Sequence, residues 1–279
     1  MFTFAKHITM EKIASTLHNI LYSDKLFLLA GPCVVENEKV ILETAEYLSR
    51  LTEKLGIPYV FKSSYRKANR TKSSSFAGIG DEKALKLLGR VREEFGVPTV
   101  TDIHESHEAS IAADYVDILQ IPAFLFRQTN LLQAAGRTDC VVNIKKGQFA
   151  GAEAMQFAAN KVRETGNDKV LLTERGNMFG YADMVVDYRN LVWMKEMGYP
   201  TVMDVTHSLQ QPNNGSGVTG GLPQLIEPMA KAAVAVGVSG LFIETHPDPS
   251  IALSDGANML PLDKMEDLLS KLLRLQDSL

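Results

Sequence analysis

Short apolar runs recur eight times along the chain, and each is rich in β-branched, aliphatic or aromatic residues. The runs span residues 26–31, 57–62, 97–102, 115–122, 140–145, 169–175, 200–207 and 238–246. Strands with one face in water alternate apolar and polar residues, whereas continuous apolar runs are typical of parallel strands covered on both faces. The pattern therefore predicts eight buried parallel strands.

Amphipathic segments alternate with these runs. In residues 38–55, for example, Leu48 and Leu51 lie on the same apolar face of a helix. Helices are predicted over residues 38–55, 81–95, 105–113, 127–137, 151–165, 182–197, 223–236 and 262–275. Strand and helix units that alternate without a linker favour a single-domain (β/α)₈ TIM barrel over residues 26–279, after a short N-terminal extension of residues 1–25.

An open, Rossmann-like sheet is the weaker alternative. Such sheets bind nucleotides through a Gly-x-Gly-x-x-Gly turn after the first strand. The first apolar run is instead followed by Pro32 and Cys33, and the sequence contains no P-loop motif. Both features count against a nucleotide-binding protein.

Composition limits the partners and the compartment. The 279 residues carry 29 Lys and Arg against 33 Asp and Glu, a net charge of −4, which argues against nucleic acid or an anionic membrane as a partner. The longest uncharged apolar stretch, residues 232–243, is too short to span a bilayer, and the N-terminus lacks the apolar core of a secretory signal. Cys33 and Cys140 are the only cysteines, so no disulfide framework is expected. We therefore expect a cytoplasmic protein.

Polar residues stand at or just after the carboxyl end of every predicted strand. They are Cys33, Lys62, Asp102, Gln120, Lys145, Arg175, His207 and Glu244. In a TIM barrel these ends meet at one rim, where active sites are built. Polar caps and loop contacts could account for two or three such residues but not comfortably for all of them, so the pattern favours a functional site.

The cationic members of this set point to anionic ligands. With the loop after the second strand included, the cations are Lys62, Lys67, Arg70, Arg127, Lys145 and Arg175. Their convergence in a net-acidic protein would suit one or two substrates that carry phosphate or carboxylate groups. Ion pairing with the protein's own carboxylates is the alternative for any single member.

A second grouping could bind a metal. Cys33, His207, Glu244 and Asp255 offer a thiolate, an imidazole and two carboxylates, a plausible set for Zn²⁺, Fe²⁺ or Mn²⁺. Cys33, His207 and Glu244 become neighbours only if the first, seventh and last strands adjoin. Cys33 could instead be a small buried apolar residue, and His207 a general base without a metal. Cys140 is assigned to the core.

Several motifs then match a known family. They are FKSS at 61–64, KANR at 67–70, TDIHE at 101–105, QIPAFLFRQT at 120–129, VNIKKGQF at 142–149, DVTHSLQ at 204–210 and ETHPDP at 244–249. In this order, over residues 26–262, the chain resembles the 3-deoxy-D-manno-octulosonate-8-phosphate synthases, also called 2-dehydro-3-deoxyphosphooctonate aldolases. The resemblance implies a (β/α)₈ barrel, commonly a homotetramer. The implied reaction condenses phosphoenolpyruvate with D-arabinose 5-phosphate and water, and it releases phosphate in lipopolysaccharide synthesis.

The resemblance also assigns roles to residues. Those expected to hold phosphoenolpyruvate are Lys62, Lys67, Lys145 and Arg175. Those expected around arabinose 5-phosphate are Asn69, Arg70 and Arg127, the last in its own or a neighbouring subunit's site, and the substrate-binding set is completed by Thr71, Asp102 and Gln120. The expected catalytic residues are Lys62, Lys67, His207 and Asp255. A Cys after Gly-Pro marks the metal-dependent members of the family, so the expected ligands are Cys33, His207, Glu244 and Asp255.

The chain departs from the family at three positions. Arg66 replaces an Asp or another non-basic residue, Thr71 replaces Ser, and Ala77 stands where Arg is frequent. These changes concern the binding of the sugar phosphate. Two alternatives remain: the related seven-carbon synthase, which uses erythrose 4-phosphate and typically reads Lys-Pro-Arg-Thr in place of KANR, and a non-catalytic anion-binding barrel.

Overall fold

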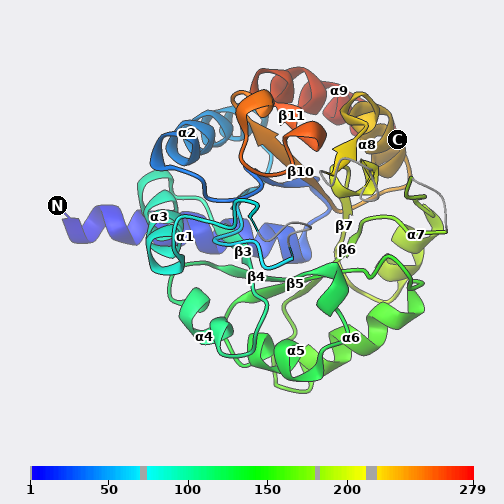
Figure 1. Cartoon of the computed structure of the whole chain (residues 1–279), viewed down its shortest axis with the longest axis horizontal. Helices are drawn as coiled ribbons and strands as arrows, with labels where there is room; N and C mark the ends of the chain where they lie inside the picture. Colours follow the sequence, from blue (N-terminus) through cyan, green and yellow to red (C-terminus); the bar gives the residue numbers. More distant parts are fainter. Residues whose placement is uncertain (1, 70–73, 180–182, 212–218) are drawn as a thin grey trace.

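Parallel strands close into a barrel, and each strand pairs with the next one in chain order until β10 pairs with β1 (Figure 1). In this computed structural model, residues 2–69, 74–179, 183–211 and 219–279 are described, with side chains from residue 9 onward. The barrel strands are β1 (Phe27–Gly31), β2 (Tyr59–Lys62), β3 (Thr99–Asp102), β4 (Ile118–Ile121), β5 (Val141–Lys145), β6 (Val170–Glu174), β7 (Thr201–Asp204) and β10 (Gly240–His246). Each lies within a predicted run, so the (β/α)₈ prediction is confirmed.

Helices surround the barrel. They are α2 (Glu38–Leu55), α3 (Asp81–Phe95), α4 (Glu108–Ala113), α5 (Thr129–Gly136), α6 (Glu153–Arg163), α7 (Arg189–Glu196), α8 (Ile226–Ala235) and α9 (Met265–Asp277), whereas α1 (Phe2–Tyr22) lies at one end of the barrel. Short strands lie outside the barrel order: β8 (Gln210–Gln211) pairs with β9 (Gly220–Gly221), and β11 (Leu260–Pro261) pairs with β10. Within the described ranges, none of the helices has the length and apolar character needed to cross a membrane.

Local signals explain why α2 has the predicted bounds. Asn37 precedes the helix, and its side chain accepts a hydrogen bond from the backbone N–H of Val40 at 2.9 Å. Gly56 ends the helix in a left-handed conformation with φ 69°, which a residue with a side chain adopts at a cost. The helix buries Ile41 and Leu48 against the barrel.

The prediction for α7 was wrong at its start. A helix was expected over residues 182–197, but α7 begins at Arg189. Asn177 and Val185 form an antiparallel bridge, in which each backbone N–H donates to the other's carbonyl, at 2.9 and 3.0 Å. This pairing uses backbone groups near Val185 that a helix would need, so the helix starts later.

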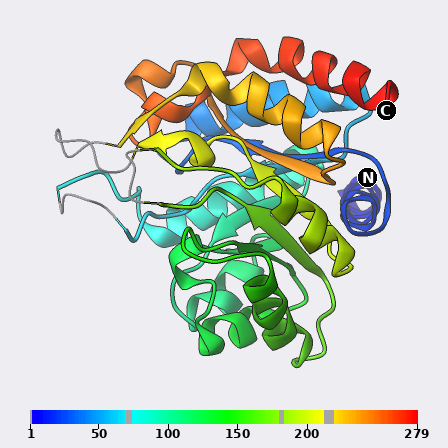
Figure 2. The same cartoon turned by 90° about the vertical axis from the view of Figure 1, so that its right-hand side faces the viewer.

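The N-terminal extension, to which no element was assigned, forms helix α1. It lies across the end of the barrel from which the strands start (Figure 2). Ile20 is 1% exposed and packs with Phe27 of β1 and with other side chains of the barrel interior. The helix therefore closes the amino-terminal end of the barrel.

The interior next to α1 is filled by an apolar layer. Its barrel members are Phe27, Leu29, Val60, Val100, Ile118, Val141, Leu171, Val202 and Phe242. They form a cluster separate from the larger core between the strands and the outer helices. Because side chains alternate along a strand, the residue two positions further on also faces inward. The barrel is thus a packed core at this end, and only its carboxyl end can hold a site.

Candidate active site

Two residues beyond the apolar layer, the inward positions become polar. This polar layer consists of Lys62, Asp102, Gln120, Asn143, Thr173, Asp204 and Glu244, together with Lys145, which lies two residues further along β5 than Asn143. All of them are buried, with Asp102 the most exposed at 7%. Buried polar and charged groups are costly unless they are paired, so the contacts of each member define what the layer can do.

One part of the polar layer is a chain of hydrogen bonds across neighbouring strands. Ser64 and the amide of Gln120 both donate to Asp102. Asn143 donates to the Gln120 oxygen at 2.9 Å, and Thr173 donates to the Asn143 oxygen at 2.7 Å. Each amide is thereby fixed in one orientation, because its oxygen and its nitrogen have different partners. This chain holds Asp102 and Gln120 rigidly at the rim.

Two of the buried lysines form ion pairs within the layer. Lys62 forms an ion pair with Glu244 and donates to the carbonyl of Cys33 at 3.0 Å. Lys145 lies 2.6 Å from Asp204 and 3.8 Å from the centroid of the Phe242 ring. These contacts fix both ammonium groups, so each is a positive charge held in place before a ligand arrives.

Lys67 and Arg175 differ from these lysines because neither has an ion-pair partner among the residues that the structure describes. Arg175 is 5% exposed, and it donates to Gln210 Oε1 at 2.9 Å and approaches Met184 Sδ at 2.8 Å. Burial lowers the pKa of Lys67, but electrostatic interactions with Cys33, Glu244 and Asp102 outweigh burial and raise it above its usual range. Both cations are therefore available for anionic ligands.

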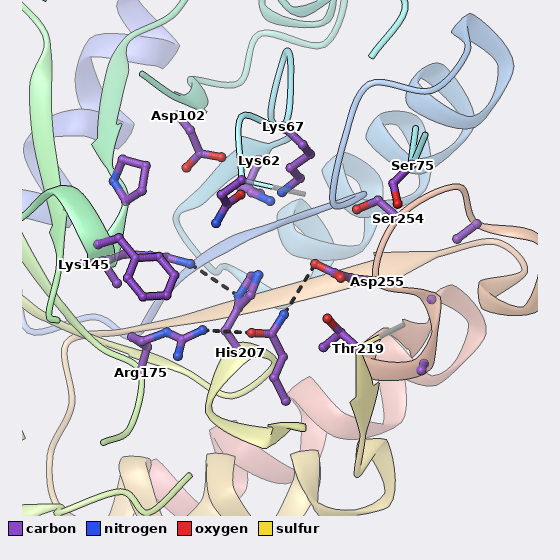
Figure 3. Close-up of a pocket in the computed structure, with 18 of the residues that line it drawn as sticks. Lys62, Lys67, Ser75, Asp102, Lys145, Arg175, His207, Thr219, Ser254 and Asp255 are labelled. Atoms are coloured by element: carbon purple, nitrogen blue, oxygen red, sulfur yellow. Dashed lines mark hydrogen bonds between the residues drawn. The ribbon is translucent and has the colours of Figure 1, made fainter. Parts of the chain in front are cut away.

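A cavity of about 930 Å³ opens over the polar layer, and Lys67, Lys145 and Arg175 reach it from different elements (Figure 3). It is large enough for small metabolites. The predicted site residues that line it are Lys62, Lys67, Asn69, Asp102, Gln120, Lys145, Arg175, His207 and Asp255. Arg70 and Thr71 lie outside the described residues.

The predicted convergence of the cations was wrong for Arg127. This residue is exposed and lines a separate depression with Phe157 and Lys161. The reason is local, because a 3₁₀ turn over Ala123–Leu125 follows β4 before the chain reaches Arg127. Within one chain, Arg127 does not contribute to the cavity at the rim.

Asp204 orients His207. One carboxylate oxygen of Asp204 accepts the backbone N–H of Thr206 at 3.0 Å and that of His207 at 2.8 Å. The other oxygen lies 2.7 Å from His207 Nδ1, so the proton of a neutral imidazole belongs on Nδ1. Burial raises the pKa of Asp204, but His207 and Lys145 outweigh it and hold the pKa well below its usual range. His207 Nε2 is left as the free acceptor, 3.5 Å from Glu244 Oε1.

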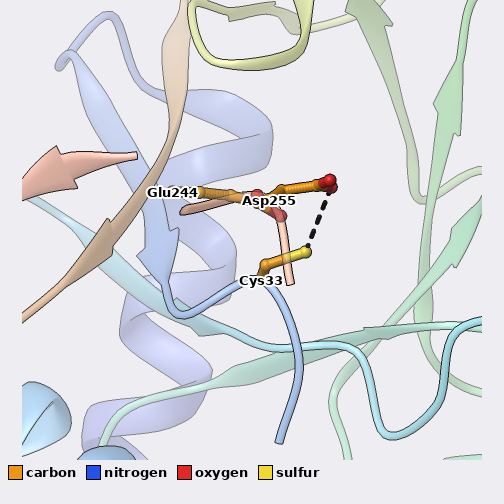
Figure 4. Close-up of side chains that lie close together, drawn as sticks. All are labelled: Cys33, Glu244 and Asp255. Carbon is orange, nitrogen blue, oxygen red and sulfur yellow. Dashed lines mark hydrogen bonds between the residues drawn. The ribbon is translucent and has the colours of Figure 1, made fainter. Parts of the chain in front are cut away.

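Cys33, Glu244 and Asp255 form a cluster at the junction of β1 and β10 (Figure 4). The register pairs Gly31 with Glu244, so barrel closure brings these segments together as predicted. One ligand atom of each residue lies within 4.8 Å of the others, and Cys33 Sγ is 3.4 Å from Asp255 Oδ2. His207 lies beside this cluster but is not one of its three members.

The cluster fits a divalent cation. Glu244 Oε2 is buried and lacks a hydrogen-bond partner in the described part of the chain. Burial raises the pKa of the Cys33 thiol to about 12, and the charges of Glu244 and Asp255 act in the same direction. A buried sulfur between carboxylates is unfavourable for a thiolate unless a positive charge lies among them. A bound cation would satisfy both the thiolate and the unpartnered oxygen.

Asp204, Gln210 and Ser254 were missed as site residues. Ser254 Oγ lies 3.1 Å from Cys33 Sγ, and Gln210 contacts both Arg175 and Asp255. A signal existed for Asp204, which is a charged residue within a predicted strand, two positions after the inward-facing Val202. Gln210 lies in the two-residue strand β8 and Ser254 in the loop after β10, and neither segment is long enough for a periodicity to identify them.

Arg66 and Ala77 are two of the positions at which the chain departs from the family pattern. Their side chains do not reach the cavity. Arg66 pairs with Glu108 and lies 3.3 Å from Asp81, on the outer side of the loop after β2. Ala77 contributes its backbone carbonyl, which accepts the N–H of Lys67 at 2.8 Å. Arg66 thus braces the loop that carries Lys67 and Asn69, and it does not contact the space above the polar layer.

Known proteins of one family resemble this chain over most of its length. Residues 16–279 match the DAHP synthetase I family. Proteins named 2-dehydro-3-deoxyphosphooctonate aldolase are 50% identical in Koribacter versatilis, over 91% of this chain and 92% of the relative, and 51% identical in Legionella pneumophila strain Corby, over 88% and 90%. The one from Hydrogenovibrio crunogenus is 47% identical over 90% of this chain and 91% of its own length. The chain therefore belongs to the DAHP synthetase I family and, within it, to the 2-dehydro-3-deoxyphosphooctonate aldolases.

Proposed function

We propose that this chain condenses phosphoenolpyruvate with D-arabinose 5-phosphate and water, to give 3-deoxy-D-manno-octulosonate 8-phosphate and inorganic phosphate for lipopolysaccharide synthesis. The names of the relatives support this assignment. One observation on the chain itself carries it: Lys67 and Arg175 face one cavity without an ion-pair partner in the described ranges. Cations without carboxylate partners favour ligands with several negative charges.

Phosphoenolpyruvate is assigned to Lys62, Lys67, Lys145 and Arg175. Arg175 is fixed by Gln210, so its planar guanidinium is oriented before a phosphate or carboxylate binds. Lys62 and Lys145 are fixed by Glu244 and Asp204 and add positive charge beneath the anion. Such prepositioned charges suit a reaction whose barrier depends on orientation and electrostatics.

Arabinose 5-phosphate is assigned to the side of the cavity that contains Asn69, Asp102 and Gln120. Burial raises the pKa of Asp102, but Lys67 and Lys62 outweigh it and hold the pKa below its usual range. Asp102 therefore stays ionised and can accept a hydrogen bond from a sugar hydroxyl. Arg70 and Thr71 complete the proposed subsite, and Arg127 is proposed to reach the sugar phosphate from a neighbouring subunit.

A divalent cation is proposed at Cys33, Glu244 and Asp255, with His207 Nε2 as a fourth ligand. The donor set suits Zn²⁺, Fe²⁺ or Mn²⁺, and the thiolate favours the first two. When bound, such an ion supplies Lewis acidity, either to polarise the aldehyde or to lower the pKa of water. The contact of Asp204 with Nδ1 leaves Nε2 of His207 free for this role.

In the proposed reaction, C3 of phosphoenolpyruvate attacks the aldehyde carbon, and positive charge develops at C2. Water then adds to C2, and phosphate leaves to give the ketone. Lys62, Lys67, His207 and Asp255 are the proposed catalytic residues. All of them line the cavity, so they can contact the reacting groups directly.

Phosphate release from phosphoenolpyruvate tests the proposal. We expect release to require arabinose 5-phosphate, to cease after prolonged chelation, and to return when a divalent ion is added. A preference for erythrose 4-phosphate would identify the seven-carbon synthase instead, and no release with either aldose would leave a non-catalytic anion-binding barrel. Full activity after chelation would contradict the metal but not the condensation.

A cytoplasmic homotetramer is part of the same proposal. Phe124, Phe149 and Phe157 are 60%, 67% and 69% exposed, and Phe157 shares a depression with Arg127. Exposed aromatic side chains beside an arginine are typical of protein–protein contacts. Light scattering on the purified protein should give the mass of four chains, whereas a monomer that remains fully active would argue against the role proposed for Arg127.

A further inference from the structure

Glu36 and His246 form a buried hydrogen-bonded pair next to the metal-binding cluster, and neither is a member of it. Their exposed fractions are 9% and 1%. His246 Nε2 lies 3.0 Å from Glu36 Oε1, and His246 Nδ1 accepts the backbone N–H of Asp248 at 3.0 Å. Because Nδ1 accepts, the proton of the neutral ring is on Nε2, which donates to Glu36.

The second oxygen of Glu36 holds another segment. Glu36 Oε2 accepts the backbone N–H of Leu253 at 2.9 Å. One carboxylate therefore connects the loop after β1, the end of β10 and the loop that follows β10. Glu36 is distant in the chain from the other two segments, and its carboxylate joins all three.

Each of these segments also carries one member of the cluster. Cys33 precedes Glu36 by three residues, Glu244 precedes His246 by two, and Asp255 follows Leu253 by two. Asp255 has φ 52°, and no other non-glycine residue in the described part of the chain has a positive φ. Such a conformation persists only where the surroundings hold it. The bond from Leu253 to Glu36 is positioned to do so.

We propose that Glu36 and His246 are positioning residues that set the spacing of Cys33, Glu244 and Asp255 and thereby the affinity of this cluster for a divalent cation. This inference rests on the metal site proposed above. Neither residue supplies a ligand atom, and each acts through the segment that it holds. Outer residues of this kind typically change metal affinity by about 10–100-fold when they are replaced.

Cobalt provides a probe that does not depend on turnover. The purified full-length protein is stripped with a chelator and titrated with Co²⁺, and the charge-transfer absorption of a Co²⁺–thiolate bond reports both occupancy and the participation of Cys33. We expect Glu36→Gln and His246→Asn to bind Co²⁺ about 10–100-fold more weakly than the unsubstituted protein. Circular dichroism confirms that each variant is folded.

Two substitutions at His246 distinguish positioning of the cluster through Glu36 from a structural role confined to the turn at Asp248. Asn can still accept the N–H of Asp248 but cannot reach Glu36, whereas Gln can donate to Glu36 but loses the contact with Asp248. Positioning through Glu36 predicts that His246→Gln binds Co²⁺ more tightly than His246→Asn. A role confined to the turn at Asp248 predicts the reverse order, which would overturn the proposal.

Asp117 provides a matched control. It is also 9% exposed, and it also accepts a backbone N–H, from Thr99 at 3.0 Å, and a side-chain donor, Arg92 at 2.9 Å. Asp117→Asn should bind Co²⁺ as the unsubstituted protein does. Equal affinities in Glu36→Gln, His246→Asn and the control would overturn the inference and leave the metal site standing. Absence of the thiolate band in the unsubstituted protein would contradict the metal site itself, and with it the inference.

Discussion

The barrel interior contains two layers that lie two residues apart on the same strands and have opposite character. On β2, Val60 belongs to the apolar layer and Lys62 to the polar layer, and on β10 the corresponding residues are Phe242 and Glu244. The apolar layer is closed by Ile20 of α1, whereas the polar layer lies under the cavity. The comparison shows that position along a strand, and not the strand's overall pattern, separates packing from chemistry.

The two layers also differ in what they contribute to stability. Burial of an aliphatic or aromatic side chain in the apolar layer stabilises the fold by roughly 1.5–3 kcal/mol. A buried ion pair such as Lys62–Glu244 adds little net stability, because desolvation of both charges offsets their attraction. Stability therefore does not explain the polar layer, whereas the binding of anionic ligands does.

The largest effect is expected for Lys62→Met. This change leaves Glu244 as a buried charge without its lysine partner, which should destabilise the protein by about 3–5 kcal/mol and abolish phosphate release. Denaturant unfolding and a phosphate-release assay measure the two losses. Unfolding is measured on the chelator-treated protein, because a bound cation would itself compensate the charge of Glu244, and unchanged stability there would show that Glu244 does not need Lys62 as its partner.

The double variant Lys62→Met, Glu244→Met sharpens the comparison. Replacement of both charges by apolar side chains should recover most of the lost stability without recovering activity. The polar layer would then contribute to the free energy of unfolding as the apolar layer does, and it would no longer support the reaction. Recovery of activity would mean that neither charge is needed for the reaction.

In the apolar layer, Leu171→Ala should lower stability and leave activity unchanged, which is the reverse of the result expected for the double variant. Leu171 is fully buried, so its truncation should lower the free energy of unfolding by about 2–5 kcal/mol. At a temperature where the variant stays folded, kcat and KM should match those of the unsubstituted protein. A large loss of kcat with little loss of stability would show that the division between the layers is wrong.

A smaller, pH-dependent effect is expected outside both layers, at Glu108. Burial raises the pKa of Glu108, but its hydrogen bonds with His104 and Tyr65 and the charge of Arg66 outweigh burial and lower the pKa to about 2. Because the folded pKa lies below the unfolded value of about 4.3, the stabilisation is complete above that value and is lost as the pH falls towards 2. The stability difference between the unsubstituted protein and Glu108→Gln should therefore shrink over this range.

Arg66→Met provides the companion measurement. The Arg66 side chain is 32% exposed, so loss of its pairs with Glu108 and Asp81 should cost only about 0–1 kcal/mol near neutral pH. Acid titration of unfolding in both variants measures these effects. A difference that grew as the pH fell would contradict the lowered pKa of Glu108.

Much of the fold could be predicted because local signals and burial agree. Helix α3 has the predicted bounds, and its buried stripe includes Leu85, Leu88 and Val91. The late start of α7 could not be predicted, since it depends on the pairing of Asn177 with Val185. Nor could the helical structure of α1, because the sequence does not reveal that Ile20 packs against the barrel interior.

The site could be predicted as far as topology determines it. Barrel closure places Cys33 near Glu244, and parallel strands bring Lys62 and Lys145 to one rim. The partners of each charge could not be predicted, because they depend on side-chain directions. Asp204, which neutralises Lys145 and orients His207, is the clearest example.

The central claim is that phosphoenolpyruvate binds above the polar layer to Lys67 and Arg175, which have no ion-pair partner among the residues that the structure describes. Calorimetric titration of phosphoenolpyruvate into the unsubstituted protein, Lys67→Met, Arg175→Met and Leu171→Ala tests it most directly. Hydrogen bonds to charged groups contribute about 1.5–3 kcal/mol, so each cation variant should bind roughly 10–150-fold more weakly, while Leu171→Ala should bind as the unsubstituted protein does. Unchanged affinity in both cation variants would contradict the account.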